Sequence, residues 1–128
     1  MFASFDETYW PTLIIKYNGT PTKEEWAAYL HKLGSYFNYK EEFYWCIDCS
    51  MLDYHIPITF IFSQISFLRV TRPLSKKYVK KTMLFVPPSI KHMIDLVLTF
   101  IKPQNPFKIV KSSATKSSEE LIDIFRKF

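Results

Sequence analysis

The feature that most constrains the fold is a regular alternation, in which short apolar runs are separated by segments with helical apolar spacing. Aromatic and β-branched residues concentrate in the short runs, as they do in buried strands. This order favours right-handed crossovers and a mostly parallel sheet with helices packed on it. The strand-like runs are Thr12 to Tyr17, Phe43 to Asp48, Lys81 to Val86 and Phe107 to Val110.

Two of the helical segments open with a capping box, the pattern that marks a helix N-terminus. Thr22 stands three residues before Glu25, and Ser117 stands three residues before Glu120. Apolar residues then recur every three or four positions, which predicts one apolar face for each helix. The apolar positions of the four segments are Trp26, Leu30, Leu33 and Phe37; Ile58, Ile61, Phe62, Ile65 and Leu68; Ile90, Met93, Ile94, Val97 and Ile101; and Leu121, Ile124 and Phe128.

Other residues set the limits of the two middle helices. Pro57 suits the first turn of the second helix, Pro73 stops or kinks that helix, and Ser89 can cap the third. We therefore predict an α/β fold with a small mixed, mostly parallel sheet of about four to five strands and about four helices. The 128 residues fit one domain, 1–128, in which residues 1–11 form an N-terminal extension or an edge strand.

Composition favours a soluble, intracellular protein. Hydrophobic residues make up 48% of the chain, and no stretch reaches the roughly 20 apolar residues that a membrane-spanning helix needs. The N-terminal segment lacks the features of a secretory signal and contains Asp6 and Glu7. We expect a cytoplasmic protein, with the nucleus or a virion as alternatives. Richness in Lys, Ile, Phe and Tyr with only two glycines is compatible with an AT-rich genome, such as that of a protist or a large DNA virus.

The net charge of +5 is unevenly distributed along the chain. Residues 1–53 contain four lysines and eight acidic residues, whereas residues 54–128 contain thirteen basic and four acidic residues. No acidic residue occurs between Asp53 and Asp95. This asymmetry favours an anionic partner for the second half of the chain.

Three local segments together resemble the STAS, or anti-sigma-factor-antagonist-like, domain. A strand ending near Gly19 precedes the acidic helix start Thr22 to Glu25. The segment Ile47 to Ser50 resembles the Asp-x-Ser strand end of that family, and Ser117 to Leu121 resembles its final helix entry. The resemblance covers residues 12–128 and implies a STAS-like fold that binds a partner rather than catalysing a reaction.

Members of this family that act as phosphorylation switches have a Ser or Thr in the loop that leads into the second helix. The corresponding stretch here is Asp53 to Thr59, and Pro57 stands near the switch position. Thr59 would take that position only if the alignment shifted by about two residues. The candidate regulatory residues, from the end of the preceding strand to the start of the second helix, are Asp48, Ser50, Asp53 and Thr59.

A more local resemblance, to Sec14-like (CRAL-TRIO) lipid-binding domains, covers about Tyr78 to Val110. It rests on the segments Phe-Val-Pro-Pro-Ser and Phe-Ile-Lys-Pro. That family is usually longer, so the resemblance implies a related α/β layout in which the helices that enclose a lipid are missing.

The cysteines and histidines form no recognisable catalytic or metal-binding motif. Cys46 and Cys49 have C-x-x-C spacing, but a strand directs their side chains to opposite faces. We therefore predict a buried side chain at Cys46 and a loop thiol at Cys49. His31, His55 and His92 lack a partner pattern and are predicted to have surface or packing roles.

Phosphate-binding loops and carboxylate-based metal sites are also not indicated. Gly19 and Gly34 are too few to build a P-loop or a dinucleotide fingerprint. Asp48 and Asp53 flank the turn after a strand, where Asp48 is expected to close the strand end. We predict a protein that is not an enzyme and that has no cofactor, no metal site and no small-molecule substrate.

The strongest functional candidate is the basic segment after the second helix. If it is helical, its lysines share a face, and if it is extended, they partly alternate. An aromatic residue within it is placed to stack on a base. The candidate surface for an anionic partner consists of Arg69, Arg72, Lys76, Lys77, Tyr78, Lys80 and Lys81.

These features favour a non-catalytic protein-interaction or regulatory module, which binds a protein partner or a second copy of itself. In this hypothesis the second helix and its basic extension contact the partner. The first alternative is a small basic protein that binds or packages nucleic acid, such as one from a large DNA virus. The second alternative is a protein that binds an anionic lipid surface.

Overall fold

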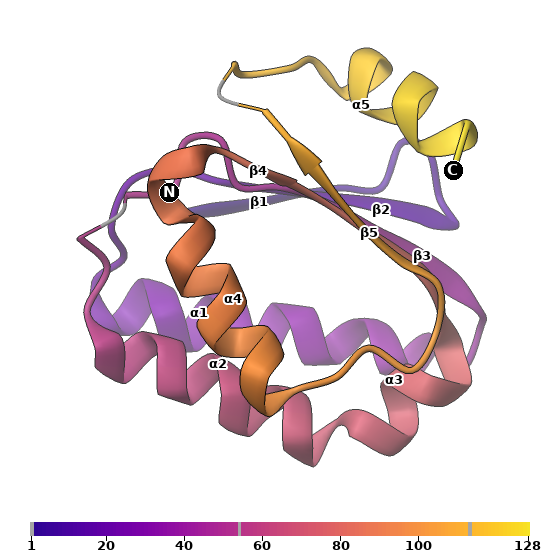
Figure 1. The fold of residues 1–128 in the computed structure, drawn as a ribbon. Helices are drawn as coiled ribbons and strands as arrows, with labels where there is room; N and C mark the ends of the chain where they lie inside the picture. The colour runs from indigo at the N-terminus through magenta and orange to yellow at the C-terminus, as the bar shows by residue number, and fades with distance from the viewer. Residues whose placement is uncertain (1, 54, 113) are drawn as a thin grey trace.

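The computed structural model describes residues 2–53, 55–112 and 114–128, and it contains a five-stranded mixed sheet with helices on both faces (Figure 1). The strands follow chain order across the sheet; β1 is antiparallel to β2 and the other neighbours are parallel. This confirms the predicted α/β class and the mostly parallel sheet. The strands are β1 (Ala3–Asp6), β2 (Thr12–Tyr17), β3 (Phe43–Asp48), β4 (Val79–Val86) and β5 (Phe107–Lys111).

The helices are divided unequally between the two faces (Figure 1). Helices α1 to α4 cover one face, and α5 alone covers the other. No helix formed by the described residues is long and apolar enough to cross a membrane. The helices are α1 (Lys23–Ser35), α2 (Ile58–Val70), α3 (Arg72–Tyr78), α4 (Lys91–Phe100) and α5 (Ser118–Arg126), with short 3-10 turns η1 (Tyr36–Tyr39) and η2 (Pro88–Ile90).

Both predicted capping boxes are present. At the start of α1, the Glu25 amide donates to Thr22 Oγ1 at 3.1 Å and the Thr22 amide donates to Glu25 Oε1 at 3.0 Å. At the start of α5, the same reciprocal pair joins Ser117 and Glu120, with both bonds at 3.2 Å. The backbone hydrogen bond from Thr22 lowers the pKa of Glu25, because it stabilises the carboxylate form.

The second helix ends just before Pro73, as predicted, whereas the cap predicted for the third helix is wrong. The middle of the basic segment forms a short helix of its own, α3, because Pro73 can occupy a first turn but cannot continue α2. The chain bends at Thr71, whose amide bonds the Phe67 carbonyl oxygen at 2.9 Å. Ser89 does not cap α4, because Pro88 starts the η2 turn at this point.

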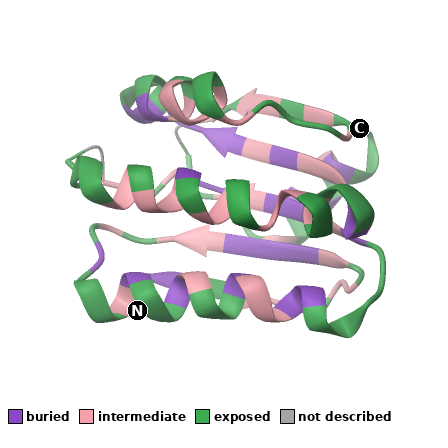
Figure 2. Ribbon diagram, turned by 90° about the horizontal axis from the view of Figure 1, so that it is seen from below, coloured by how far each residue is buried: buried purple, intermediate pink, exposed green. Residues whose placement is uncertain are grey.

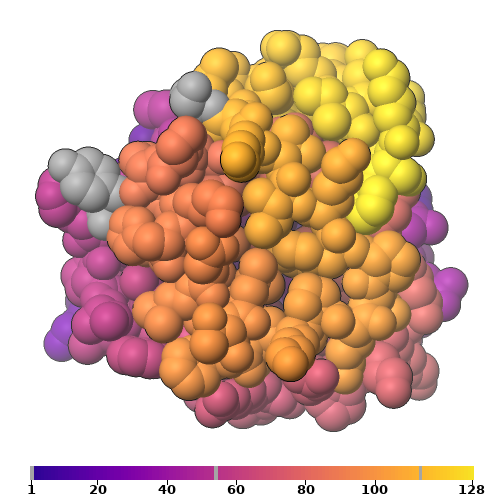
Figure 3. Space-filling model, viewed as in Figure 1, coloured from indigo at the N-terminus to yellow at the C-terminus, as the bar shows by residue number. Residues whose placement is uncertain are grey.

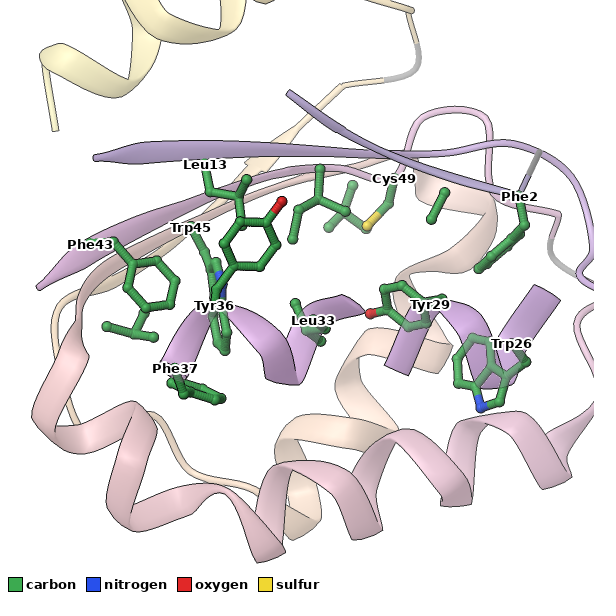
Figure 4. Close-up of a cluster of buried hydrophobic side chains, with 14 of the residues drawn as sticks. Phe2, Leu13, Trp26, Tyr29, Leu33, Tyr36, Phe37, Phe43, Trp45 and Cys49 are labelled. Carbon is green, nitrogen blue, oxygen red and sulfur yellow. The ribbon is translucent and has the colours of Figure 1, made fainter. Parts of the chain in front are cut away.

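Alternate residues of the strands supply two separate cores. Leu13 and Ile15 of β2 contribute to the main cluster between the sheet and helices α1 to α4, whereas Ile14 contributes to the cluster under α5. Figure 4 shows the main cluster, which is rich in aromatic rings. On the other side, Leu121 and Phe125 of α5 close the smaller cluster. Each central strand is therefore buried on both faces, as expected for parallel sheets.

The two cysteines lie on opposite faces of the sheet, as predicted. Cys46 belongs to the cluster under α5, and Cys49 belongs to the main cluster. Cys49 is only 2% exposed, so it is part of the core and not an open loop thiol. Burial, with a smaller contribution from the Asp48 carboxylate, raises the pKa of each thiol to about 12. Both thiols therefore stay protonated near neutral pH, which makes them poor nucleophiles.

We expect the free energy of unfolding to fall as the pH rises above 9. The unfolded thiols ionise near pH 9.0, while the native thiols stay protonated until about pH 12, so the stabilisation is complete below pH 9 and is lost as the pH approaches 12. Within this window each thiol lowers the free energy of unfolding by about 1.4 kcal/mol per pH unit.

Urea unfolding under reducing conditions, measured at several pH values in that window, checks this prediction. The Cys49→Ala variant removes one titrating thiol but leaves the buried tyrosines, Tyr17 and Tyr29, whose pKa values are raised by burial as well. Its stability should therefore fall less steeply with pH than that of the wild type, by about 1.4 kcal/mol per unit. Equal slopes for the two proteins would contradict the assignment.

Candidate interaction surface

The predicted regulatory residues begin at the end of β3. Asp48 is 3% exposed, and its Oδ1 accepts a hydrogen bond from the Ser50 amide at 2.9 Å. This bond closes the end of the strand, the role that the sequence predicts for Asp48. The hydroxyl of Ser50 is buried and has no hydrogen-bond partner among the described residues.

Asp53 ties this loop to the turn after β2. Its carboxylate accepts hydrogen bonds from the Thr20 hydroxyl and the His55 amide, each at 2.9 Å, and its amide donates to the Gly19 carbonyl oxygen at 3.1 Å. Gly19 has a φ of 71°, a conformation that favours glycine, and its amide donates to the Met51 carbonyl oxygen. The bond from the His55 amide is the largest of several effects that lower the pKa of Asp53.

The four predicted regulatory residues therefore do not form one cluster. Asp48 and Ser50 are bonded to each other, Asp53 is bonded to the neighbouring turn, and Thr59 is an exposed residue in the first turn of α2. Pro57 is the N-cap of α2 and provides no side-chain cap. No group of three or more His, Cys, Asp or Glu residues in the described ranges is arranged to hold a metal ion.

The predicted basic surface is divided between α2, α3 and β4. Lys76 and Lys77 are exposed on α3, but Tyr78 is buried in the main cluster, and Lys77 Nζ lies 5.2 Å from the centre of its ring. Lys80 and Lys81 belong to β4, which begins two residues earlier than predicted. The pairing of β3 with β4 shifts register here, because Phe43 is opposite Val79 and Tyr44 is opposite Lys81.

Several of these cations already have partners within the fold. Lys80 forms an ion pair with Glu42 at 3.1 Å. Arg69 lies over the Phe100 ring at 5.7 Å. With the Gln104 side-chain oxygen turned toward it, Arg72 donates from Nε and Nη2 at 2.7 and 3.2 Å. The seven residues thus occupy different surfaces, and no single face gathers them.

Lys81 lies on the α5 side of the sheet. Its Nζ donates to the Phe128 carbonyl oxygen at 3.1 Å and lies 4.6 Å and 4.9 Å from the ring centres of Phe125 and Phe128. The Tyr44 ring is 5.8 Å away. A cation between aromatic faces is held by the ring electrons as well as by the hydrogen bond. Lys81 therefore fastens the end of α5 to the sheet.

An exposed apolar patch on α2 and α4 was not predicted. Ile58 and Phe62 were expected on the apolar face of the second helix, yet they are 56% and 48% exposed, and Ile65 is the buried residue of α2. Figure 2 shows exposed and half-buried positions alternating along the helices on this side of the sheet. The Phe62 ring meets the Phe100 ring of α4 edge-on, with centres 6.4 Å apart. We call Ile58, Phe62, Phe100 and the neighbouring Arg69 the α2–α4 patch.

Two further exposed apolar residues follow at the end of α2 and on α3. Val70 at the end of α2 is 79% exposed, and Leu74 of α3 is 43% exposed. Helical periodicity alone did not reveal these surfaces, because α2 has apolar residues on several sides and only the packed structure tells which of them are covered.

Two matched lysine variants test the role of Lys81. Lys81→Met keeps the apolar stem but loses the charge-assisted hydrogen bond and the ring contacts, so we expect its free energy of unfolding to fall by about 2 kcal/mol. Lys80→Met loses only a largely exposed ion pair, and its loss should be about 0.5 kcal/mol or less. Chemical unfolding of both variants measures the difference, and equal losses would contradict the structural role.

Comparison with known proteins identifies the fold. No family model matches the sequence, and no curated protein matches it. Among solved structures, the anti-sigma factor antagonist SpoIIAA, in its unphosphorylated form, superposes with a TM-score of 0.53 and 13% sequence identity. The match covers 98% of this chain and 99% of that one. The chain therefore has the STAS-like α/β fold that the sequence resemblance implied.

Proposed function

We propose that this protein is a non-catalytic interaction module that binds a partner protein through the α2–α4 patch. The observation that carries the proposal is the exposed pair of rings, Phe62 and Phe100, with Arg69 lying over the second ring. Aromatic and arginine side chains are the residues that most often dominate binding energy at protein interfaces. Their burial by a partner removes apolar surface from water, which favours association.

The inner side of α2 packs against α1, and these contacts hold the helix, with its exposed outer side, in a fixed position. The Trp26 indole N–H donates to the Ser63 hydroxyl at 3.1 Å, and the Trp26 and Phe60 rings are 5.2 Å apart. Further along, the Phe67 ring passes within 3.5 Å of the position that a side chain at Gly34 would take. A rigid surface loses little conformational entropy when it binds, so its contacts convert efficiently into affinity.

Charge indicates the chemistry of the partner. No acidic residue occurs in the sequence between Asp53 and Asp95, and Asp95 is itself paired with Lys91 at 3.0 Å. The patch therefore combines apolar side chains with an arginine; α2 has no acidic residue, and the acid of α4, Asp95, is paired with Lys91. The complementary surface is apolar with an acidic rim, as on an amphipathic helix flanked by Asp or Glu.

The fold neighbour agrees with a binding role. SpoIIAA is described as an anti-sigma factor antagonist, a name that refers to action on another protein. At 13% identity the comparison bears on the fold, so the partner chemistry proposed here rests on the patch itself.

An unbiased library of displayed helical peptides tests the proposal. We expect selected peptides to carry an apolar face with acidic flanks and to bind in fluorescence anisotropy with an affinity that weakens as salt is added. Phe62→Ser should weaken binding at least about tenfold. Tyr39→Ser is the matched control, because Tyr39 is also 48% exposed but lies in η1, and it should leave the affinity unchanged.

Three results would overturn the proposal. The first is a selection that yields no peptide dependent on Phe62. The second is a dimer of the free protein, seen in sedimentation, that dissociates on Phe62→Ser, because the occupant would then be a second copy. The third is tight binding to short DNA or RNA that needs Lys76 and Lys77 but not Phe62, because the nucleic-acid hypothesis would then take precedence.

A further inference from the structure

A cavity of about 230 Å³ lies between the sheet and the helical layer. Its walls come from β3 and β4 on one side and from α1, α2 and α4 on the other, and residues such as Ile47, Leu84, Ile61 and Val97 make it largely apolar. The lining extends from Trp26, in the first turn of α1, to Lys76 on α3. The cavity is therefore elongated, as an alkyl chain requires.

The size of the cavity limits its occupant. An engineered apolar cavity of about 150 Å³ is large enough for benzene, while pockets for drug-sized molecules are typically about 300–1,000 Å³. A volume of about 230 Å³ lies between the two. It suits a short alkyl chain.

One end of the cavity is cationic. Arg72 and Lys76 of α3 line it there, together with Lys102 from the segment that leads to β5, and no acidic residue contributes to the described lining. In Figure 3, α4 and this segment form the front surface in orange. Asn105 holds the segment against α3, because its side-chain amide donates to the carbonyl oxygens of Lys76 and Val79 at 3.1 and 2.6 Å.

The cationic end also contains a buried donor. Trp45 lines the cavity and extends from β3 toward the helical layer (Figure 4). Its Nε1 is buried and has no acceptor among the described residues, although buried indole N–H groups usually have one. Trp45 lies opposite Thr82 of β4, near the start of the strand and close in sequence to Val79, which Asn105 contacts. The unpartnered donor and the cations therefore lie at the same end.

From this arrangement we propose that the cavity binds a medium-chain monocarboxylate. The alkyl chain lies between the sheet and helices α2 and α4, and the carboxylate is bound at the cationic end by Lys76 and Arg72, within reach of the Trp45 donor. A charge-assisted hydrogen bond to a carboxylate is stronger than a neutral one, which favours an anionic headgroup over an alcohol. The proposal does not depend on the α2–α4 patch, and its test uses other residues.

Calorimetric titration with octanoate tests the proposal directly. We expect saturable binding of one octanoate per chain, weaker binding of 1-octanol because it lacks the charge, and no binding of acetate because it lacks the chain. Lys76→Glu should weaken octanoate binding by about tenfold or more. Lys77→Glu makes the same change in net charge on the next residue, which does not line the cavity, and should leave the affinity within about twofold.

A second pair of variants tests where the alkyl chain of octanoate binds. Val97→Phe fills the cavity and should abolish octanoate binding, whereas His92→Phe places the same phenyl ring at an exposed position of the same helix, away from the cavity, and should leave binding unchanged. Far-UV circular dichroism checks that each variant is folded, and if Val97→Phe is not folded, the two lysine variants decide. The proposal is overturned if octanoate does not bind, or if Lys76→Glu and Lys77→Glu change its affinity equally.

Discussion

The structure depends on a mostly parallel sheet whose central strands are buried on both faces. Rows of side chains run across the strands in register: Ile14, Cys46 and Met83 form one row on the α5 side. Ile15 and Ile47, one residue further on, are partners on the other side. A slip of one residue between two strands would move each row to the opposite face. The aromatic core and the α5 core therefore fix the register together.

The two faces of this sheet are covered to different extents. The Lys81 contacts and the buried residue Leu121 hold α5 closely against its side. On the other side, α2 contributes one fully buried residue, Ile65, although most of its residues are apolar. The helix is held from the side by α1 and leaves space between itself and the sheet. This incomplete packing of α2 accounts for both the cavity and the exposed patch. Each is lined in part by apolar residues of α2 that are not buried against the rest of the protein.

Much of the fold could be predicted from the sequence because its signals are local. The capping boxes and the alternation of strand-like and helical segments depend on neighbouring residues, and the structure confirms them. The second helix ends before Pro73 as predicted, and the same proline fits the first turn of the next helix. The Ser89 cap was wrong, because Pro88 starts the η2 turn and Ile90 is the N-cap of α4. Periodicity placed Phe62 on an inward face, since it gives the apolar positions of a helix but not the neighbours that cover them.

The candidate sites were harder to predict, because they depend on where the chain returns in space. Lys76 and Lys81 are five residues apart, yet one lines the cavity and the other lies under α5 on the opposite face. Trp45 is far from α3 in the sequence, and the pairing of β3 with β4 brings it to the cationic end of the cavity. A charge count along the sequence therefore indicated an anionic partner without indicating its size.

The stretch without acidic residues, between Asp53 and Asp95, contributes cations to two places that lie apart in the fold. On the outside, Arg69 stands beside the Phe62 and Phe100 rings with no acid on its own helix. Inside, the end of the cavity has Arg72 and Lys76 and no carboxylate in its described lining. A long polyanion needs a continuous basic surface, and the fold divides these cations between separate faces. Recognition of single carboxylates, on a partner protein or on a small amphiphile, needs only the local arrangement that each place provides.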